Sequence, residues 1–373
     1  METITKDISL DQKLDELLIT LEEQASRADE LGETQEIALD AIRKSGYLGC
    51  LVPEEFGGMG ENVIFASRFL QKVATVDPSI AIIAFQHMSV ISRILEWGTD
   101  FHKQKYLPLL ASGKWIGASA WSEKGAGANK QKLSTVGSYL GNDTWDISGA
   151  KTFTTGAGLA DLYLVLVQTG NTDNTGIYGN TGQSFFLIET STPGVKANSK
   201  LNLSGMRGSS TGFIELDKCI VDSKSIIGPL GGAPKIISGI RESGLSLGAI
   251  SVGISQAAYK IAYEHIQNRE LQDKELMKFK LSELNMHIEA ARALVEFSAQ
   301  GTHENQKIIS YQSKIFASEV SEKVCRDCQQ LVGGGGFMRG SNVERFYRDA
   351  RAVALMGPVN DLAKEIIGRE LVM

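Results

Sequence analysis

The sequence predicts an α+β protein of several domains, with helical domains at both ends of the chain and a β-domain between them. Apolar side chains recur at helical spacing over residues 1–115. Residues 116–228 instead contain short apolar runs separated by turn residues, which is the pattern of β-strands. Long helical patterns return over residues 229–373. Because 373 residues are too many for one small core, we assign these three segments to three domains.

The composition argues against several classes of partner. The formal net charge of −6 gives no reason to expect nucleic acid or an anionic membrane surface. No apolar run is long enough to cross a bilayer, and the polar, charged N-terminus does not resemble a secretory signal. The four cysteines are sparse, which is typical of the reduced cytoplasm, where we expect the protein. Cys325 and Cys328 lie in a helix-like stretch without a second cysteine pair, so we expect packed thiols and no metal site.

The first predicted domain is a set of helices. The leucines of residues 10–21 recur at helical spacing. Further helices are expected over residues 34–45, 62–74 and 79–95. The last of these is nearly all apolar, so we expect it at the centre of the domain. It carries His87, which we interpret as a packed core residue, whereas His102 lies among charged residues and is expected to be solvated.

Two segments that contain glycine flank a predicted β-hairpin in the second domain. They are Ser122–Asn129 and Lys151–Asp161. Between them, Leu133–Leu140 is predicted to be extended, Gly141-Asn142-Asp143 marks a turn, and Thr144–Ile147 returns. Glycines in the first segment would let the backbone pass close to a ligand, because no Cβ stands in the way.

The side chains at these segments suit a flat heteroaromatic ring. Trp121 and Phe153 supply flat apolar faces. Ser122, Thr154 and Thr155 supply hydroxyls. Rings stack on aromatic side chains, and small hydroxyls reach the polar atoms at a ring edge. The alternative is a β-domain with glycine turns and no ligand, which spacing alone favours, since glycine turns and threonines in strands are common.

The third predicted domain consists of long helices. One continuous helix is expected over Ile236–Asn268, where many small residues allow close packing and leave room for a ligand. Two more are expected over Met277–Gln300 and Asn305–Leu331, and a last helix reaches Met373. The run Gly333–Gly336 ends the third helix, because glycine readily leaves the helical conformation.

Several of these segments, in this order, resemble motifs of the acyl-CoA dehydrogenase family. Trp121–Asn129 resembles the TEPGAGSD segment of that family, and Lys151–Asp161 resembles its KxWITNGxxAD segment. Gln330 with the glycine run resembles the QxxGGxGF segment, and VERFYRDAR follows it at Val343–Arg351. The resemblance covers nearly the whole chain. It implies the family's fold, which has an N-terminal all-α domain, a central β-barrel-like or sandwich domain and a C-terminal four-helix bundle.

The resemblance implies a flavoprotein that binds FAD. In the family the two central segments hold the flavin ring, which implies ring contacts here from Trp121, Ser122, Phe153, Thr154 and Thr155. Gln330, Gly333 and Gly334 would contact the ADP part of FAD bound by a neighbouring subunit, so a homodimer or homotetramer is implied. The stretch after Arg269 lacks the family's FGxxixxxQ pattern, which leaves FMN or a transiently bound reduced flavin as alternatives.

The implied reaction is α,β-dehydrogenation of an acyl thioester. A carboxylate removes the α-proton, and the β-hydrogen leaves as hydride to flavin N5. The glutamate that most often serves as the base would stand at Gly357, which cannot take a proton. Some relatives place it early in the long helix of the third domain, where the alignment puts Ser243, with Glu242 just before it. We therefore take Glu242 as the candidate base. The alternatives are that Glu242 is a solvated carboxylate at a helix terminus, or that the base is Asp361, which more simply caps the last helix.

Three further positions bear on the substrate. Ser243 and Gly357 stand where relatives place the base, and we expect them beside the acyl group. Ala128 replaces a serine that helps relatives to hold the CoA pyrophosphate, so either CoA or a carrier protein could bear the acyl group. Arg207 could meet a phosphate or a carboxylate, or it could order a surface loop.

Three functions follow from the resemblance. The first is a flavin-dependent acyl-thioester dehydrogenase of fatty acid metabolism, an oxidoreductase on CH–CH bonds with an electron-transfer flavoprotein as acceptor. The second is a two-component monooxygenase on the same fold, which takes reduced flavin from a flavin reductase. The missing glutamate and the pair Pro358-Val359 agree with this second function. The third is a non-catalytic relative that binds flavin weakly or not at all.

Overall fold

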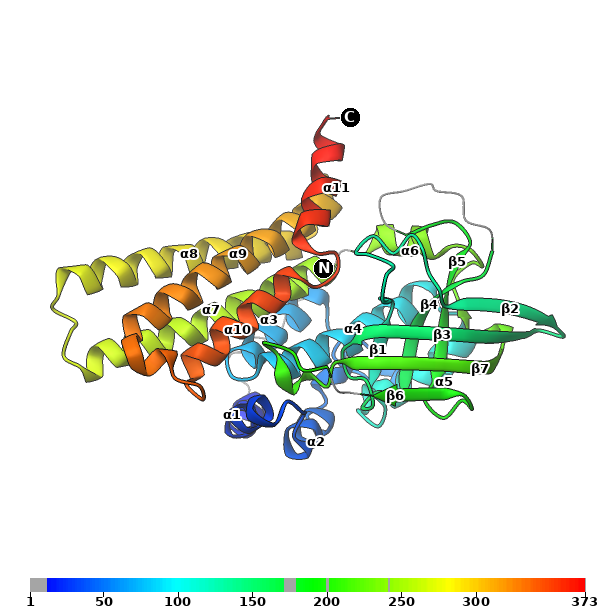
Figure 1. Cartoon of the computed structure of the whole chain (residues 1–373), viewed down its shortest axis with the longest axis horizontal. Coiled ribbons are helices and arrows are strands. Elements are labelled where there is room, and N and C mark those ends of the chain that lie inside the picture. The colour runs from blue at the N-terminus through cyan, green and yellow to red at the C-terminus, as the bar shows by residue number, and fades with distance from the viewer. Residues whose placement is uncertain (1–11, 171–178, 199–200, 241, 373) are drawn as a thin grey trace.

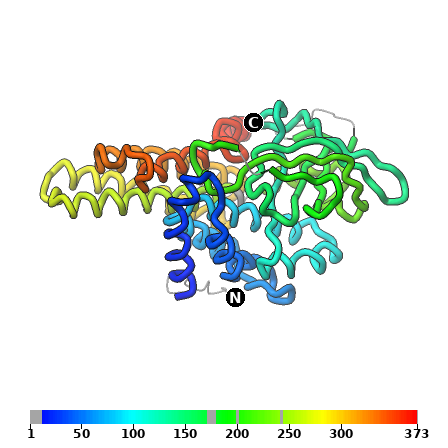
Figure 2. Tube along the Cα trace, turned by 60° about the horizontal axis from the view of Figure 1, so that its bottom comes forward, coloured from blue at the N-terminus to red at the C-terminus, as the bar shows by residue number. Residues whose placement is uncertain are grey.

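The computed structural model describes residues 12–170, 179–198, 201–240 and 242–372 of the chain. The long C-terminal helices and the central sheet lie at opposite ends of an elongated molecule (Figure 1). Helices α1 and α2, in dark blue, lie on one side of the junction between these two parts (Figure 2). The predicted order of helical, β and helical segments is confirmed, while the domain boundaries after residues 115 and 228 stay predictions.

The N-terminal segment contains five α-helices, and side chains cap the starts of the two central ones. They are α1 (Gln12–Leu31), α2 (Glu36–Lys44), α3 (Val63–Ala74), α4 (Pro78–Trp97) and α5 (Asp100–Ala111), with 3₁₀ turns at Tyr47–Gly49 and Glu54–Phe56. The Asn62 side chain accepts hydrogen bonds from the backbone N–H groups of Ile64 and Phe65. Asp77 caps α4 in the same way, and Pro78 occupies the first turn, where no backbone donor is needed. These caps fix the starts of the two helices at the centre of the domain.

Helix α4 is buried along most of its length, as the sequence predicts. It is the one helix among the described residues that is long and apolar enough to cross a membrane, and 89% of its most apolar window is buried inside the protein. It packs against α3, against β1 (Gly117–Ala120) and against α7 (Glu242–Asn268). Helix α4 is therefore a core element on which all three segments of the chain meet.

The structure confirms the prediction for one of two histidines and contradicts the prediction for the other. His87 is fully buried, and its Nδ1 accepts a hydrogen bond from the backbone N–H of Gly117 at 3.1 Å, so the prediction of a packed core residue is confirmed. Burial lowers the pKa of His87 to about 4. The expectation that His102 is solvated is wrong, since only 1% of it is exposed. Its ring caps the start of α5 through Thr99 and also contacts the carbonyl of Lys224, and burial lowers its pKa.

The central domain is one mixed sheet. Its strands are β1 (Gly117–Ala120), β2 (Val136–Gly141), β3 (Thr144–Thr154), β4 (Leu162–Gln168), β5 (Gln183–Glu189), β6 (Val195–Asn198), β7 (Gly212–Asp222) and β8 (Ile226–Ile227). They run in the order β6-β7-β3-β2-β4-β5-β8, with β1 paired to β4. The predicted hairpin is confirmed, with Tyr139 opposite Trp145. Asn142 and Asp143 both have positive φ, as the tight turn between right-twisted strands requires.

Strand β4 is buried on both faces, which explains its nearly continuous apolar sequence. Successive side chains of a strand point to opposite sides of the sheet. One side joins a cluster with α4 and α5 through Leu162, Leu164 and Leu166. The other side joins the main core through Tyr163, Val165 and Val167.

One prediction about the C-terminal helices is wrong. They are α6 (Ala233–Gly239), α7 (Glu242–Asn268), α8 (Glu275–Ala299), α9 (Gln306–Val332), α10 (Asn342–Ala354) and α11 (Asn360–Val372). The single helix expected over residues 236–268 is in fact two, because Ile240 is extended. Ile236 and Ile237 of α6 pack onto the sheet, whereas α7 packs onto α3 and α9, so the chain must change direction between them. On α9 the thiols of Cys325 and Cys328 are buried, as predicted, and burial raises the pKa of both.

Small residues let α7 approach its neighbours closely. A Cβ on Gly253 would lie 2.2 Å from the carbonyl oxygen of Gln71 on α3. A Cβ on Gly244 would lie 2.4 Å from the carbonyl oxygen of Ser310 on α9. Such contacts are far inside van der Waals distance, so glycine is required at both positions.

Replacing Gly253 with alanine should therefore separate α7 from α3. We expect Gly253→Ala to lower the free energy of unfolding by about 1–3 kcal/mol, as overpacking of a core does. Gly368→Ala is the control, because nothing lies within 4 Å of a Cβ at that helical position. The control should keep or raise the melting temperature, since alanine favours helix over glycine. Equal melting temperatures for the two variants would contradict the close contact.

Candidate functional site

The two predicted glycine segments lie side by side near the end of strand β3. The backbone N–H of Thr152 donates to the carbonyl of Ser122 at 2.8 Å. Next to this bond, Lys151 Nζ lies 2.6 Å from Glu123 Oε1. The segment that carries Trp121 and Ser122 is thus held against the end of β3, which carries the three predicted ring contacts of the second segment.

A buried carboxylate anchors this arrangement. The Glu123 side chain is 2% exposed and accepts hydrogen bonds from Lys151, from the backbone and hydroxyl of Ser134, and from the backbone of Thr135. Burial by itself would raise the pKa of Glu123, but the charge of Lys151 and these hydrogen bonds outweigh it and lower the pKa to about 2. Burial lowers the pKa of Lys151 to about 8, so both partners are charged at neutral pH.

Phe153 is held in a conformation that turns its ring outward. Its φ is +53°, in the left-handed region, and the pairing of β3 with β7 is irregular between Lys151 and Thr154. The residue is 63% exposed. An aromatic residue with positive φ is strained, and strain of this kind gathers at sites that bind ligands. The exposed ring therefore offers a flat face for stacking.

The neighbouring polar groups are buried, and two of them lack partners. Trp121 packs on Phe185 with ring centroids 5.0 Å apart. Among the described residues, neither Trp121 Nε1 nor Thr154 Oγ1 has a hydrogen-bond partner. Thr155 accepts a hydrogen bond from the hydroxyl of Thr211 at 3.3 Å. Buried polar atoms without partners are costly, so both atoms could gain a hydrogen bond from a bound polar group. The residues present fit a flavin.

Other predicted cofactor residues lie far from this group within one chain. Gln330, Gly333 and Gly334 stand at the end of α9, at the opposite end of the C-terminal helices from the sheet (Figure 1). All three are exposed. Arg207 is engaged by the protein itself, because it donates to the backbone of Asp29 and to the side chain of Asn202. It therefore orders its loop, which was the second of its two predicted roles.

The residues predicted for catalysis and substrate lie on two elements. Glu242 and Ser243 are in the first turn of α7, but their side chains lie outside the described part of the chain. Gly357 is exposed in the loop between α10 and α11, and Ala128 is exposed in the first glycine segment. Asp361 lies in the first turn of α11. Each of these assignments stays a prediction.

The loop around Gly357 is held by a lysine that sequence reasoning missed. Lys314 on α9 is 1% exposed, and its Nζ donates to the carbonyls of Met356 at 2.8 Å and Pro358 at 2.6 Å. In the described part of the chain it forms no ion pair, and burial lowers its pKa to about 7. The only signal in the sequence is a single lysine within a run of small and apolar residues on α9, which does not reveal its partners.

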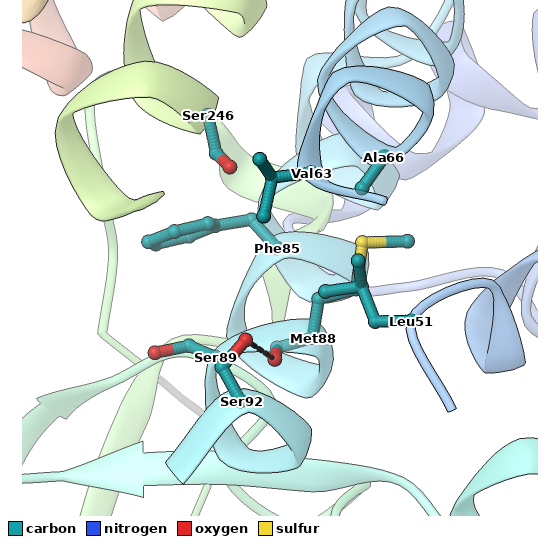
Figure 3. Close-up of a pocket in the computed structure, with 8 residues that line it drawn as sticks. All are labelled: Leu51, Val63, Ala66, Phe85, Met88, Ser89, Ser92 and Ser246. Atoms are coloured by element: carbon teal, nitrogen blue, oxygen red, sulfur yellow. Dashed lines mark hydrogen bonds between the residues drawn. The ribbon is translucent and has the colours of Figure 1, made fainter. Parts of the chain in front are cut away.

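A small cavity lies where α3, α4 and α7 meet. Its volume is about 10 Å³, and its lining residues are Leu51, Val63, Ala66, Phe85, Met88, Ser89, Ser92 and Ser246 (Figure 3). Four of these lie at helical spacing along α4, so they form one stripe that faces the cavity. Sequence reasoning expected room for a ligand beside the small residues of α7 and did not identify the lining residues.

Comparison with known proteins identifies the family of the chain. Models of the acyl-CoA dehydrogenase N-terminal, middle and C-terminal domains match residues 16–114, 118–219 and 231–372. The chain belongs to the acyl-CoA dehydrogenase family. It is 30% identical over 357 residues to a probable acyl-CoA dehydrogenase of Mycobacterium leprae, covering 93% of this chain and 90% of that protein. It is 29% identical over 362 residues to an acyl-CoA dehydrogenase of Bacillus subtilis, covering 94% of each.

A solved structure shares the whole acyl-CoA dehydrogenase fold. The butyryl-CoA dehydrogenase of Megasphaera elsdenii superimposes with a TM-score of 0.89 and 26% identity, covering 98% of this chain and 100% of that one. The predicted fold class is therefore confirmed over the described residues. Acyl-CoA dehydrogenases are flavoproteins, which agrees with the group of aromatic and unpartnered polar side chains at the end of β3.

Phe153→Gly should raise the stability of the chain and lower its affinity for flavin. Glycine adopts positive φ freely, so we expect the free energy of unfolding to rise by about 1 kcal/mol. Loss of the exposed ring should weaken flavin binding at least tenfold, measured by flavin fluorescence titration. Lys218→Gly is the control, because Lys218 also has a φ of +53° but lies elsewhere, on β7. It should gain stability and keep its flavin affinity, and unchanged affinity in Phe153→Gly would refute the stacking role.

Lys314→Met should change how stability depends on pH. The folded chain releases the proton of Lys314 near pH 7, whereas the unfolded chain holds it to about pH 10.5. The unfolded state therefore binds more protons in this window, and the wild-type chain gains up to about 1.4 kcal/mol per pH unit from this group. Urea unfolding at pH 7, 8 and 9 should show that the free energy of unfolding of the wild type increases relative to that of Lys314→Met as pH rises. Lys314→Arg keeps a charged donor and should also lack the gain, and parallel curves for all three proteins would contradict the buried titration.

Proposed function

We propose that the chain is a flavin-dependent oxidoreductase that oxidises the CH–CH bond next to the carbonyl of an acyl thioester. The observation that carries the proposal is the group at the end of β3. There an exposed aromatic ring, buried hydroxyls and two polar atoms without partners are held together by the Glu123–Lys151 pair. Membership of the acyl-CoA dehydrogenase family supports the assignment of this group to a flavin ring.

We propose FAD as the flavin. Phe153 would pack on the ring, while Trp121, Ser122, Thr154 and Thr155 would hydrogen-bond or border its edge. When bound, FAD would supply the acceptor for the hydride that leaves the β-carbon of the substrate. Gln330, Gly333 and Gly334 would serve the ADP part of FAD in a second subunit, which makes the active protein a dimer or tetramer. Their exposure at the far end of the molecule supports this assignment.

Glu242 is the proposed base. The carboxylate would remove the α-proton, with Ser243 and Gly357 beside the acyl group. Supporting this choice, position 242 lies one helical turn before Ser246, which lines the cavity between α4 and α7. Gly357 has no proton acceptor, and its loop is fixed by Lys314 through backbone atoms alone.

The carrier of the acyl group and the electron acceptor are further proposals. Ala128 has no hydroxyl to meet a pyrophosphate, which favours a carrier-bound acyl group alongside acyl-CoA. An electron-transfer flavoprotein is the proposed acceptor, and the cytoplasm is the proposed location. The two-component monooxygenase remains the second candidate, because the loop at Gly357 carries no carboxylate.

The deciding experiment is the visible spectrum of the FAD-reconstituted protein under anaerobic conditions, before and after addition of acyl thioesters. We expect the oxidised flavin band to bleach. Glu242→Gln should slow bleaching at least 100-fold, a typical contribution of a positioned base. Glu275→Gln, at the first residue of α8, is the matched control and should react at the wild-type rate.

Each other outcome points to a different function. Bound flavin that stays yellow with both CoA and carrier thioesters would contradict dehydrogenation. Transfer of an oxygen atom from O₂ to an organic substrate, dependent on reduced flavin and above the rate of flavin autoxidation, would then indicate the monooxygenase. A chain that binds no flavin would indicate the non-catalytic relative. Wild-type bleaching by Glu242→Gln would keep the function and remove Glu242 as its base.

A further inference from the structure

A chain of three buried hydroxyls ends at Thr155, one of the predicted ring contacts. The hydroxyl oxygens of Ser209 and Thr211 lie 2.8 Å apart, and Thr211 Oγ1 donates to Thr155 Oγ1 at 3.3 Å. Ser209, Thr211 and Thr155 are 1%, 8% and 7% exposed. The three hydroxyls are therefore shielded from bulk water and depend on one another for hydrogen bonds.

The contacts give this chain of hydroxyls a direction. A hydroxyl has one proton to donate. Thr211 uses its proton on Thr155, so in the other contact Ser209 must donate and Thr211 must accept. Thr155 thus accepts at its oxygen and keeps its own proton, for which the described part of the chain supplies no acceptor. That proton is available to a bound group that presents an acceptor atom.

The hydroxyl at the start of the chain is held in a fixed place. Ser209 ends the 3₁₀ turn Arg207–Ser209. Its carbonyl accepts a hydrogen bond from the backbone N–H of Gly156 at 3.1 Å, so this turn and the segment after β3 are joined beside the hydroxyls. From the N-terminal domain, Thr34 Oγ1 donates to the carbonyl of Gly208. The turn is therefore anchored on both sides of Ser209.

An ordered chain of hydroxyls changes what its last member can do. A hydroxyl without partners rotates freely and serves as donor or acceptor. Since the oxygen of Thr155 already accepts from Thr211, its remaining role is that of a donor. Hydrogen bonds in a chain also polarise one another, which strengthens each by roughly 10–30%. The Thr211–Thr155 contact is long for two hydroxyls, so it can shorten when Thr155 donates to a ligand.

We propose that Ser209 and Thr211 are positioning residues for the flavin ring, because they commit the hydroxyl of Thr155 to donate to an acceptor at the ring edge. The inference rests on the proposed function, which places a flavin at the end of β3. An oxidised flavin ring presents nitrogen and oxygen acceptors along its polar edge, so a fixed donor suits it. Ser209 and Thr211 act through Thr155 and need no contact with the ring.

The test measures the affinity of the full chain, freed of flavin, for oxidised FAD by fluorescence titration. Thr211→Val keeps the shape of the side chain and removes its hydroxyl, so it should weaken FAD binding about fivefold. Thr211→Ser keeps the hydroxyl and removes the methyl group, so it should bind FAD as the wild type does. A role in packing alone predicts the opposite order, with serine as the weaker variant.

A double-mutant cycle tests whether Thr211 acts through Thr155. Thr155→Val should weaken FAD binding about tenfold, because the donor itself is lost. In the Thr155→Val background, Thr211→Val should cause no further loss. Ser210→Ala is the matched control in the same stretch of chain, because the Ser210 hydroxyl lies 2.9 Å from that of Thr34 and takes no part in the chain of hydroxyls. It should keep the wild-type affinity.

A second variant covers the case in which Thr211→Val does not fold. Ser209→Ala removes only the first hydroxyl, so Thr211 loses its donor while both threonines remain. It should weaken FAD binding about twofold, in the same direction as Thr211→Val. Near-ultraviolet circular dichroism and the melting temperature of each variant establish that it is folded.

The inference and the proposed function fail in different ways. Wild-type affinity in folded Thr211→Val and Ser209→Ala overturns the inference, as does equal weakening by Thr211→Val and Thr211→Ser. Losses that multiply in the double variant overturn action through Thr155. The predicted coupling without bleaching by acyl thioesters supports the positioning role and contradicts dehydrogenation. Bleaching by the wild type together with independent effects of the substitutions supports dehydrogenation and contradicts the positioning role.

Discussion

The buried pair of Lys151 and Glu123 is the interaction on which the site depends. Lys151 belongs to β3, and Glu123 belongs to the segment between β1 and β2, so the pair fixes one against the other. Glu123 also holds the backbone at Ser134 and Thr135, where the chain enters β2. A buried ion pair adds little net stability, but loss of one partner leaves a buried charge without compensation. Alternative registers of this segment are therefore costly, and a single arrangement results.

This rigid frame supports groups that are individually unfavourable. Phe153 keeps a strained backbone, and the polar atoms of Trp121 and Thr154 stay without partners in the described structure. The pairing of β3 with β7 before Lys151, which is interrupted once between Ile147 and Gly149, stabilises the strand that carries them. On the other side of the molecule, Gly244 and Gly253 bring α7 close to α9 and α3. The sheet thus positions the predicted ring site, while close helix contacts fix the packing of the C-terminal helices.

Much of the fold could be predicted from the sequence because its signals are local. The periodicity of the helices, the Asn142-Asp143 turn and the apolar run of β4 each depend on a few neighbouring residues. The family motifs also identified the two segments that meet at Thr152. The predictions were wrong where contacts between residues far apart in the sequence determine the local structure. The buried ring of His102 contacts the carbonyl of Lys224, which is distant in the sequence. Ile240 is extended because α6 and α7 pack on different partners. The tether by Lys314 and the cavity at Phe85 likewise exist only once separate helices meet, so no local pattern marks them.

The way Lys314 holds its loop has an evolutionary consequence. Both of its acceptors are main-chain carbonyls, and they flank Gly357 without involving any side chain there. The contacts of Lys314 that hold the chain between α10 and α11 therefore do not involve the side chain at position 357. Side chains in this loop can therefore change while its main-chain anchor is kept. A tether of this kind lets the sequence between two helices vary in evolution without loss of the packing between them.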